Sequence, residues 1–205
     1  MVIDAQGYAK LTDFGLSKEG VTDNFSARTM CGTPEYLAPE VLSRSGHGKA
    51  ADWWSLGTLI FEMLTGLPPF YSRNSLELYD CIKNGEVDFP DWLRGEARDL
   101  ISQLLRKDPS QRLGGGPGDS EELKQHEWFA DIDWDSLFHR QLEPPFTPVL
   151  SHELDVTFFD RVRTRQNFTH LPADDSAKGE MRAHSPTSPF QGFSYTEMHL
   201  DVNEH

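Results

Sequence analysis

The stretch Thr29-Met30-Cys31-Gly32-Thr33-Pro34-Glu35-Tyr36-Leu37-Ala38-Pro39-Glu40 decides the fold when it is read together with two flanking motifs. Asp13-Phe14-Gly15 precedes it, after a segment with strand character, and Asp52-Trp53-Trp54-Ser55-Leu56-Gly57 follows it. A single Asp-Phe-Gly tripeptide is weak evidence, because short motifs occur often by chance. The three motifs in this order and at this spacing form a specific signature.

These motifs resemble the C-terminal half of a protein kinase domain, and the resemblance covers essentially the whole chain. The stretch 29–40 is typical of the AGC group of Ser/Thr kinases, and the stretch 107–116 is most similar to protein kinase B and to the serum-regulated and ribosomal-protein kinases. The implied fold class is α+β, with a mostly α-helical C-lobe fragment after a short β-hairpin. The implied domains are a kinase-domain portion at 1–129 and an AGC-kinase C-terminal domain at 130–205.

The hydrophobic pattern predicts the main elements independently of that resemblance. Two short strands, 1–3 and 8–11, are expected to be joined by a turn in which Gly7 can adopt a positive φ. The first of three predicted helices is apolar on most of its faces, so we expect it to lie at the centre of the fold. From residue 143 onward the sequence predicts an extended tail. The predicted helices cover residues 49–65, 75–84 and 96–106.

Composition narrows the classes of function. The chain has 205 residues and a formal net charge of −14, which argues against a nucleic-acid-binding or anionic-membrane-binding surface. No apolar stretch is long enough to span a bilayer, and the N-terminus lacks the features of a secretory signal. Cys31 and Cys81 cannot form a disulfide framework, and the histidines show no spacing typical of a metal site. We therefore expect a soluble intracellular protein of the cytoplasm, with the nucleus as a second compartment.

The kinase resemblance implies ATP and Mg²⁺ as cofactors. Asp13 would coordinate the Mg²⁺ that bridges the phosphates of ATP, because this ion requires hard oxygen ligands. The alternative for Asp13 is an ordinary solvated turn residue. Thr12 would line the floor of the ATP site, and Phe159 would approach the adenine. Thr33 would hydrogen-bond the catalytic aspartate, the base of the reaction, which we expect to lie outside this chain.

The same resemblance assigns an activation segment and a substrate site. Thr29 matches the activation-loop phosphorylation site, where a phosphate adds about −1.5 to −2 charges that Lys18 would pair with. Glu62 matches a position that binds an arginine of the substrate. Its alternative is a partly buried helix residue with a structural partner. Three residues would wall the pocket for the substrate residue after the phosphoacceptor: Met30, Pro34 and Leu37.

Three further residues have structural roles under this resemblance. Glu40 and Arg112 would form a buried bidentate ion pair that ties the activation segment to the lobe. Removing one partner would leave a buried charge unpaired, at a cost of roughly 3–5 kcal/mol. Asp52 would bond the backbone of the catalytic loop.

The tail carries a second signature, Phe190-Gln191-Gly192-Phe193-Ser194-Tyr195, which resembles the hydrophobic motif of these kinases. In the family the two phenylalanines, here Phe190 and Phe193, dock into a groove of the N-lobe. Phosphorylation of the serine, here Ser194, strengthens this docking. One position departs from the pattern, because Leu171 stands where the turn-motif phosphosite is expected and cannot accept phosphate.

Two functions of different classes remain open. The first is a Ser/Thr kinase that transfers the ATP γ-phosphate to arginine-preceded sites in protein substrates. Phosphorylation of its activation loop and hydrophobic motif would regulate it, and an upstream kinase would bind that motif. The second is a non-catalytic docking module whose tail motif binds another kinase. The sequence contains no Gly-rich loop, no strand lysine and no His-Arg-Asp loop. We therefore expect an inactive and poorly soluble fragment whose helix 49–65 exposes apolar surface.

Overall fold

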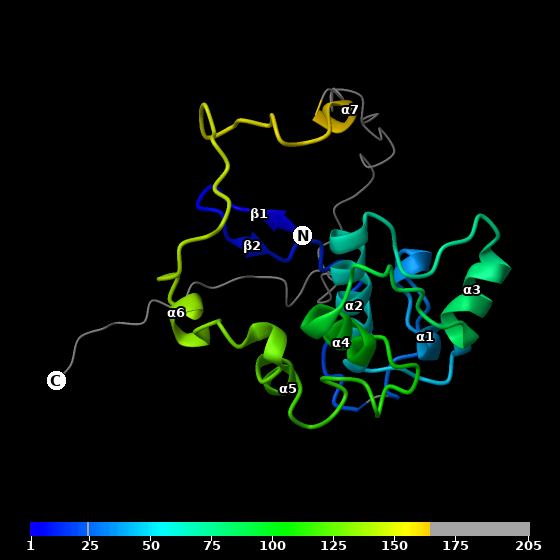
Figure 1. The fold of residues 1–205 in the computed structure, drawn as a ribbon. Helices are drawn as coiled ribbons and strands as arrows, with labels where there is room; N and C mark the ends of the chain where they lie inside the picture. Colours follow the sequence, from blue (N-terminus) through cyan, green and yellow to red (C-terminus); the bar gives the residue numbers. More distant parts are fainter. Residues whose placement is uncertain (24, 165–205) are drawn as a thin grey trace, which may run out of the picture. The chain divides into compact units, whose positions relative to one another are not determined.

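The computed structural model describes residues 1–23 and 25–164. The chain divides into two compact units, Met1–Val149 and Leu150–His205. The first unit contains a small sheet and a group of helices (Figure 1). In the described part of the second unit, the chain forms helix α7, Arg161–Thr164. A short hairpin followed by mostly helical structure confirms the predicted fold class.

The hairpin lies at the N-terminus. Strand β1, Val2–Ile3, pairs antiparallel with β2, Ala9–Lys10, so that Val2 lies opposite Lys10 and Ile3 opposite Ala9. Both strands are shorter than predicted, because regular pairing extends over these two residue pairs alone. The turn between them contains Gly7 with φ +96°, as the turn prediction required.

Three long helices form the body of the first unit and match the predicted ones to within two residues at each end. Helix α2 ends where Gly66 adopts φ +85°, a left-handed conformation that terminates many helices. Helix α4 ends at Leu104, two residues before its predicted end. The shorter helix α1, which begins at a proline, was not predicted. The bounds are Pro39–Ser43 for α1, Ala50–Thr65 for α2, Ser75–Asn84 for α3 and Gly95–Leu104 for α4.

The core forms where α2 packs against α4 (Figure 1). Gly57 allows the close approach, since a Cβ at this position would lie 2.8 Å from the Cβ of Leu104. Trp54 of α2 is fully buried and stacks on Phe70, with ring centroids 5.9 Å apart. The C-terminal turn of α2 remains open to solvent, and Met63 is 62% exposed. Helix α2 therefore exposes apolar surface at its C-terminal turn, whereas its middle turns are buried.

The remaining elements are short. They were not predicted, because helices of three to five residues carry too little periodicity to be recognised. None of the helices in the described part of the chain is long and apolar enough to cross a membrane. The short elements are η1 (Pro34–Tyr36), α5 (Ser120–Lys124), η2 (Glu127–Phe129) and α6 (Trp134–Phe138).

Candidate functional site

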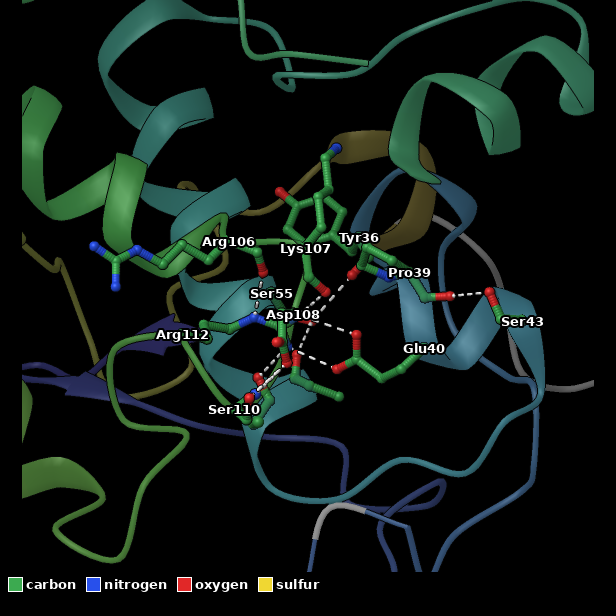
Figure 2. A network of polar contacts seen from close by, with 12 residues as sticks. Tyr36, Pro39, Glu40, Ser43, Ser55, Arg106, Lys107, Asp108, Ser110 and Arg112 are labelled. Atoms are coloured by element: carbon green, nitrogen blue, oxygen red, sulfur yellow. Dashed lines mark hydrogen bonds and ion pairs between the residues drawn. The ribbon is translucent and has the colours of Figure 1, made fainter. Parts of the chain in front are cut away.

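A buried ion pair fixes the end of the predicted activation segment (Figure 2). Glu40 lies in the first turn of α1, and Arg112 lies in the loop after α4. Arg112 Nη1 is 2.7 Å from Glu40 Oε1, and Nη2 is 2.9 Å from Oε2, so the contact is bidentate. Glu40 is 7% exposed and Arg112 is 2% exposed. The structure thus brings together two residues that only the kinase resemblance had paired.

Every N–H group of the Arg112 guanidinium has a partner. Besides the two bonds to Glu40, Nη1 donates to the carbonyl of Ala50 at 2.7 Å, and Nε donates to that of Arg106 at 3.0 Å. Nη2 also donates to the carbonyl of Lys107 at 3.3 Å. A buried ion pair is tolerated when its hydrogen-bonding groups are satisfied in this way. Arg112 therefore joins α1, the start of α2 and the loop after α4 at one point.

A second contact joins the predicted activation segment to α2. The hydroxyl of Tyr36 donates to Glu62 Oε2 at 2.6 Å, and Ser55 Oγ donates to the carbonyl of Tyr36 at 3.1 Å. Burial, together with the neighbouring Glu62 carboxylate, raises the pKa of Tyr36 to about 12. The half-buried Glu62 therefore has the structural partner that its alternative interpretation required.

The residues of the predicted activation segment and substrate site differ in their exposure. Thr29, Thr33 and Pro34 are exposed, whereas Met30 is half-buried. Leu37 is buried in the main hydrophobic core, and Met30 packs against that core. The hydroxyl-bearing residues are therefore accessible, while the inner wall of the predicted pocket is part of the helical body.

A backbone bridge holds the chain next to Thr29. The N–H of Ala27 donates to the carbonyl of His47 at 3.0 Å, and the N–H of His47 donates to that of Ala27 at 2.8 Å. Lys18, the predicted phosphate partner, instead donates to the carbonyl of Ser26 at 3.3 Å. The bridge was missed because pairing of single residues across such a distance leaves no pattern in the sequence.

The predicted metal ligand Asp13 is exposed, as is its neighbour Thr12. Asp13 has φ +64°, a left-handed conformation that is uncommon outside glycine. Its carboxylate is a hard oxygen donor of the kind that Mg²⁺ prefers, so it fits one ligand position of this ion. The described residues contain no group of three or more His, Cys, Asp or Glu side chains that could hold a metal ion.

The start of α2 carries a polar network that was not predicted. Asp119 accepts hydrogen bonds from Lys49 Nζ at 2.9 Å and from Trp53 Nε1 at 2.8 Å. Asp52, on the same first turn, is exposed and accepts no side-chain hydrogen bond from the described residues. Loss of hydration next to neighbouring protein atoms raises the pKa of Asp52. His47 lowers this pKa, and the nearby Asp119 carboxylate raises it further. The Asp52 carboxylate is thus available for the backbone contact that the resemblance assigns to it.

The structure describes one of the predicted functional residues of the tail. Phe159, the predicted adenine contact, lies in the second unit and is 56% exposed. Its N–H donates to the carbonyl of Val156 at 2.9 Å. The hydrophobic-motif residues Phe190, Phe193 and Ser194 lie outside the described residues.

Comparisons with known proteins show which family and which relatives the chain resembles. The model of the protein kinase domain family matches residues 1–129. Over 201 residues the chain is 45% identical to RAC-beta serine/threonine-protein kinase B of Xenopus laevis and 44% identical to RAC-beta serine/threonine-protein kinase A of the same species. Each comparison covers 96% of this chain and 40% of the relative. The chain therefore spans less than half the length of these relatives.

Proposed function

Because this chain belongs to the protein kinase family, we propose that it forms the activation segment, C-lobe body and tail of an AGC-type Ser/Thr kinase. The reaction is transfer of the ATP γ-phosphate to a serine or threonine that follows arginine residues in a protein substrate. The observation that carries the proposal is the anchoring of segment 33–40 by the Glu40–Arg112 and Tyr36–Glu62 contacts. This anchoring leaves Thr29 and Thr33 exposed.

Substrate preference is assigned to Glu62. Its carboxylate is fixed by the Tyr36 hydroxyl, so the orientation of the charge is set before a substrate arrives. A fixed carboxylate suits the planar guanidinium of arginine, which it can bind with two hydrogen bonds. Met30, Pro34 and Leu37 are proposed to contact the residue after the phosphoacceptor.

Asp13 is proposed to hold Mg²⁺, with Thr12 at the floor of the nucleotide site and Phe159 near the adenine. When bound, the ion neutralises charge on the phosphates, which is a large part of catalysis in phosphoryl transfer. Thr33 is proposed to hydrogen-bond the catalytic aspartate, and Asp52 to bond the backbone of the catalytic loop. This sequence contains no His-Arg-Asp motif that would supply that aspartate.

Regulation is proposed at two sites. Phosphate on Thr29 would pair with basic side chains, and Lys18 lies in the same segment. Phosphate on Ser194 would strengthen docking by Phe190 and Phe193, the motif through which an upstream kinase would bind. We place the protein in the cytoplasm, with the nucleus as a second compartment.

The test uses the gene product made from its own locus and purified with an antibody against residues 190–195. Arginine-containing peptides should be phosphorylated by the natural protein and not by the Asp13→Ala variant. Asp131→Ala is the matched control, since Asp131 is also an exposed aspartate of the first unit.

Activity that survives Asp13→Ala contradicts the proposed metal role. Absence of peptide phosphorylation by the natural protein contradicts the kinase function itself. The Glu62→Gln variant should raise the KM for arginine-containing peptides more than for peptides without arginine.

A further inference from the structure

The hydroxyl of Tyr8 contacts a distant segment of the chain. Tyr8 lies in the hairpin turn, and its Oη is 2.8 Å from the carbonyl oxygen of Arg140 and 2.9 Å from that of Leu142. A phenol has one hydrogen to donate, so the two carbonyls share it. Tyr8 is half-buried, although most residues of the strands and turn around it are exposed.

Further contacts join the same two segments. The Arg140 guanidinium carbon lies 5.4 Å from the centroid of the Tyr8 ring, and Arg140 Nη1 donates to Gln6 Oε1 at 3.4 Å. A Cβ on Gly7 would collide with the backbone of Phe146 and with the Pro144 ring. Glycine is therefore required in the turn both for its positive φ and for this close packing.

The strands of the hairpin bury little surface of their own. Each strand has two residues, and all four strand residues are exposed. A two-stranded hairpin with so little burial is marginally stable by itself. Its turn is closed internally by Asp4 Oδ1, which accepts from the N–H groups of Gln6 and Tyr8 at 3.0 and 2.9 Å.

The hairpin leads directly to the proposed metal ligand. After β2 the chain continues through Leu11, which is 72% exposed, and Thr12 to Asp13. The backbone of Asp13 is in an unfavourable left-handed conformation, which persists only where neighbouring structure holds it. Because only Leu11 and Thr12 separate β2 from Asp13, a restraint on the hairpin would limit the positions open to the Asp13 carboxylate.

We propose that residues 140–146 form a strap seated on the hairpin turn, and that Tyr8 is a positioning residue that fixes Asp13 through it. This inference rests on the proposed metal role of Asp13. The strap lowers the conformational entropy that Asp13 would lose when it binds the ion.

The experiment compares the full chain with its Tyr8→Phe variant, which loses only the hydroxyl. Hydrogen exchange measured by mass spectrometry should become about five- to tenfold faster in residues 1–16 and 139–149 together, the size expected for one lost hydrogen bond. Exchange in α4 should stay unchanged, which shows that the fold is intact. Tyr71→Phe is the matched control, because Tyr71 is 61% exposed. Gly7→Ala, which places a methyl group against Pro144 and Phe146, tests the strap without touching the hydroxyl and should accelerate exchange in the same two segments.

Metal binding is measured in a separate NMR experiment with Mn²⁺ alone. The signal is the line broadening that Mn²⁺ causes in the amide resonances of residues 11–15. The Mn²⁺ concentration needed for half-maximal broadening should rise severalfold in Tyr8→Phe and not in Tyr71→Phe. Faster exchange in only one of the two segments overturns the strap, and so does unchanged exchange in both Tyr8→Phe and Gly7→Ala. Unchanged Mn²⁺ binding in Tyr8→Phe, with binding still abolished by Asp13→Ala, overturns the positioning role and leaves the proposed function standing. If Asp13→Ala leaves the broadening unchanged, the metal role fails, and with it the positioning of a metal ligand.

Discussion

The Glu40→Gln variant provides a sharp test of how the activation segment is held. Glutamine keeps the length and most of the volume of the side chain, so the change removes the charge and little of the packing. The amide oxygen of glutamine can still accept a hydrogen bond from Arg112. Its NH₂ group, however, would face an N–H donor of the Arg112 guanidinium, which cannot accept a hydrogen bond. The three carbonyls of Ala50, Arg106 and Lys107 would remain as partners of the guanidinium.

The expected loss follows from burial. Arg112 is 2% exposed, and arginine does not release its proton in proteins, so the charge stays in place without a counter-charge. Breaking a buried pair by removing one partner costs roughly 3–5 kcal/mol. The total stability of a domain is about 5–15 kcal/mol, so this single change should remove a large fraction of it.

The assay is urea unfolding followed by tryptophan fluorescence. Trp54 reports on this site, because the Arg112 guanidinium carbon lies 5.2 Å from the centroid of its ring system. The control is Glu121→Gln, which removes the negative charge from the surface contact of Glu121 with Lys124 at 2.6 Å and should cost roughly 0–1 kcal/mol. An equal loss of stability in the two variants would contradict the role assigned to burial, since the two pairs differ chiefly in burial.

Three further outcomes are expected. Gly57→Ala should destabilise the chain by about 1–3 kcal/mol in urea unfolding, because the added methyl group meets Leu104, although alanine favours helix elsewhere. Since the pKa of Tyr36 is raised to about 12, its contribution to stability should be complete below pH 10 and be lost as the pH approaches 12. In a spectrophotometric titration, the Tyr36→Phe variant should lose the tyrosine ionisation step that occurs near pH 12 in the natural chain. Burial lowers the pKa of Lys107 from 10.5 to about 8, so the folded state disfavours its charge. Unfolding midpoints should therefore rise from pH 8 toward pH 10.5 in the natural chain, and less in Lys107→Met.

The long elements could be predicted from the sequence because their signals are local. Helix α3 has its predicted bounds, since Asn74 caps it by accepting a hydrogen bond from the N–H of Leu76 at 2.9 Å. The short elements depend on packing against the rest of the fold, and isolated turns of helix are unstable. Two of them did carry a usable signal, because Pro34 and Pro39 occupy the first positions of η1 and α1.

The candidate site could be predicted only through family resemblance. Nothing local in the sequence connects Glu40 with Arg112, and burial of both charges becomes visible only in the fold. The Tyr36–Glu62 bond and the Asp119 network were missed for the same reason, because each joins residues far apart in the chain. That Asp13 follows a short strand was predictable, whereas its left-handed backbone was not.

The separation between Glu40 and Arg112 also has a kinetic consequence. The two residues are 72 positions apart, so their ion pair can form only after the intervening chain, including α2 and α4, has been brought into place. Both charges must lose their water together, which favours formation of the pair after the main folding barrier. The pair should therefore mainly slow unfolding. Its loss should raise the unfolding rate, which shortens the lifetime of the folded segment, and should leave the folding rate almost unchanged.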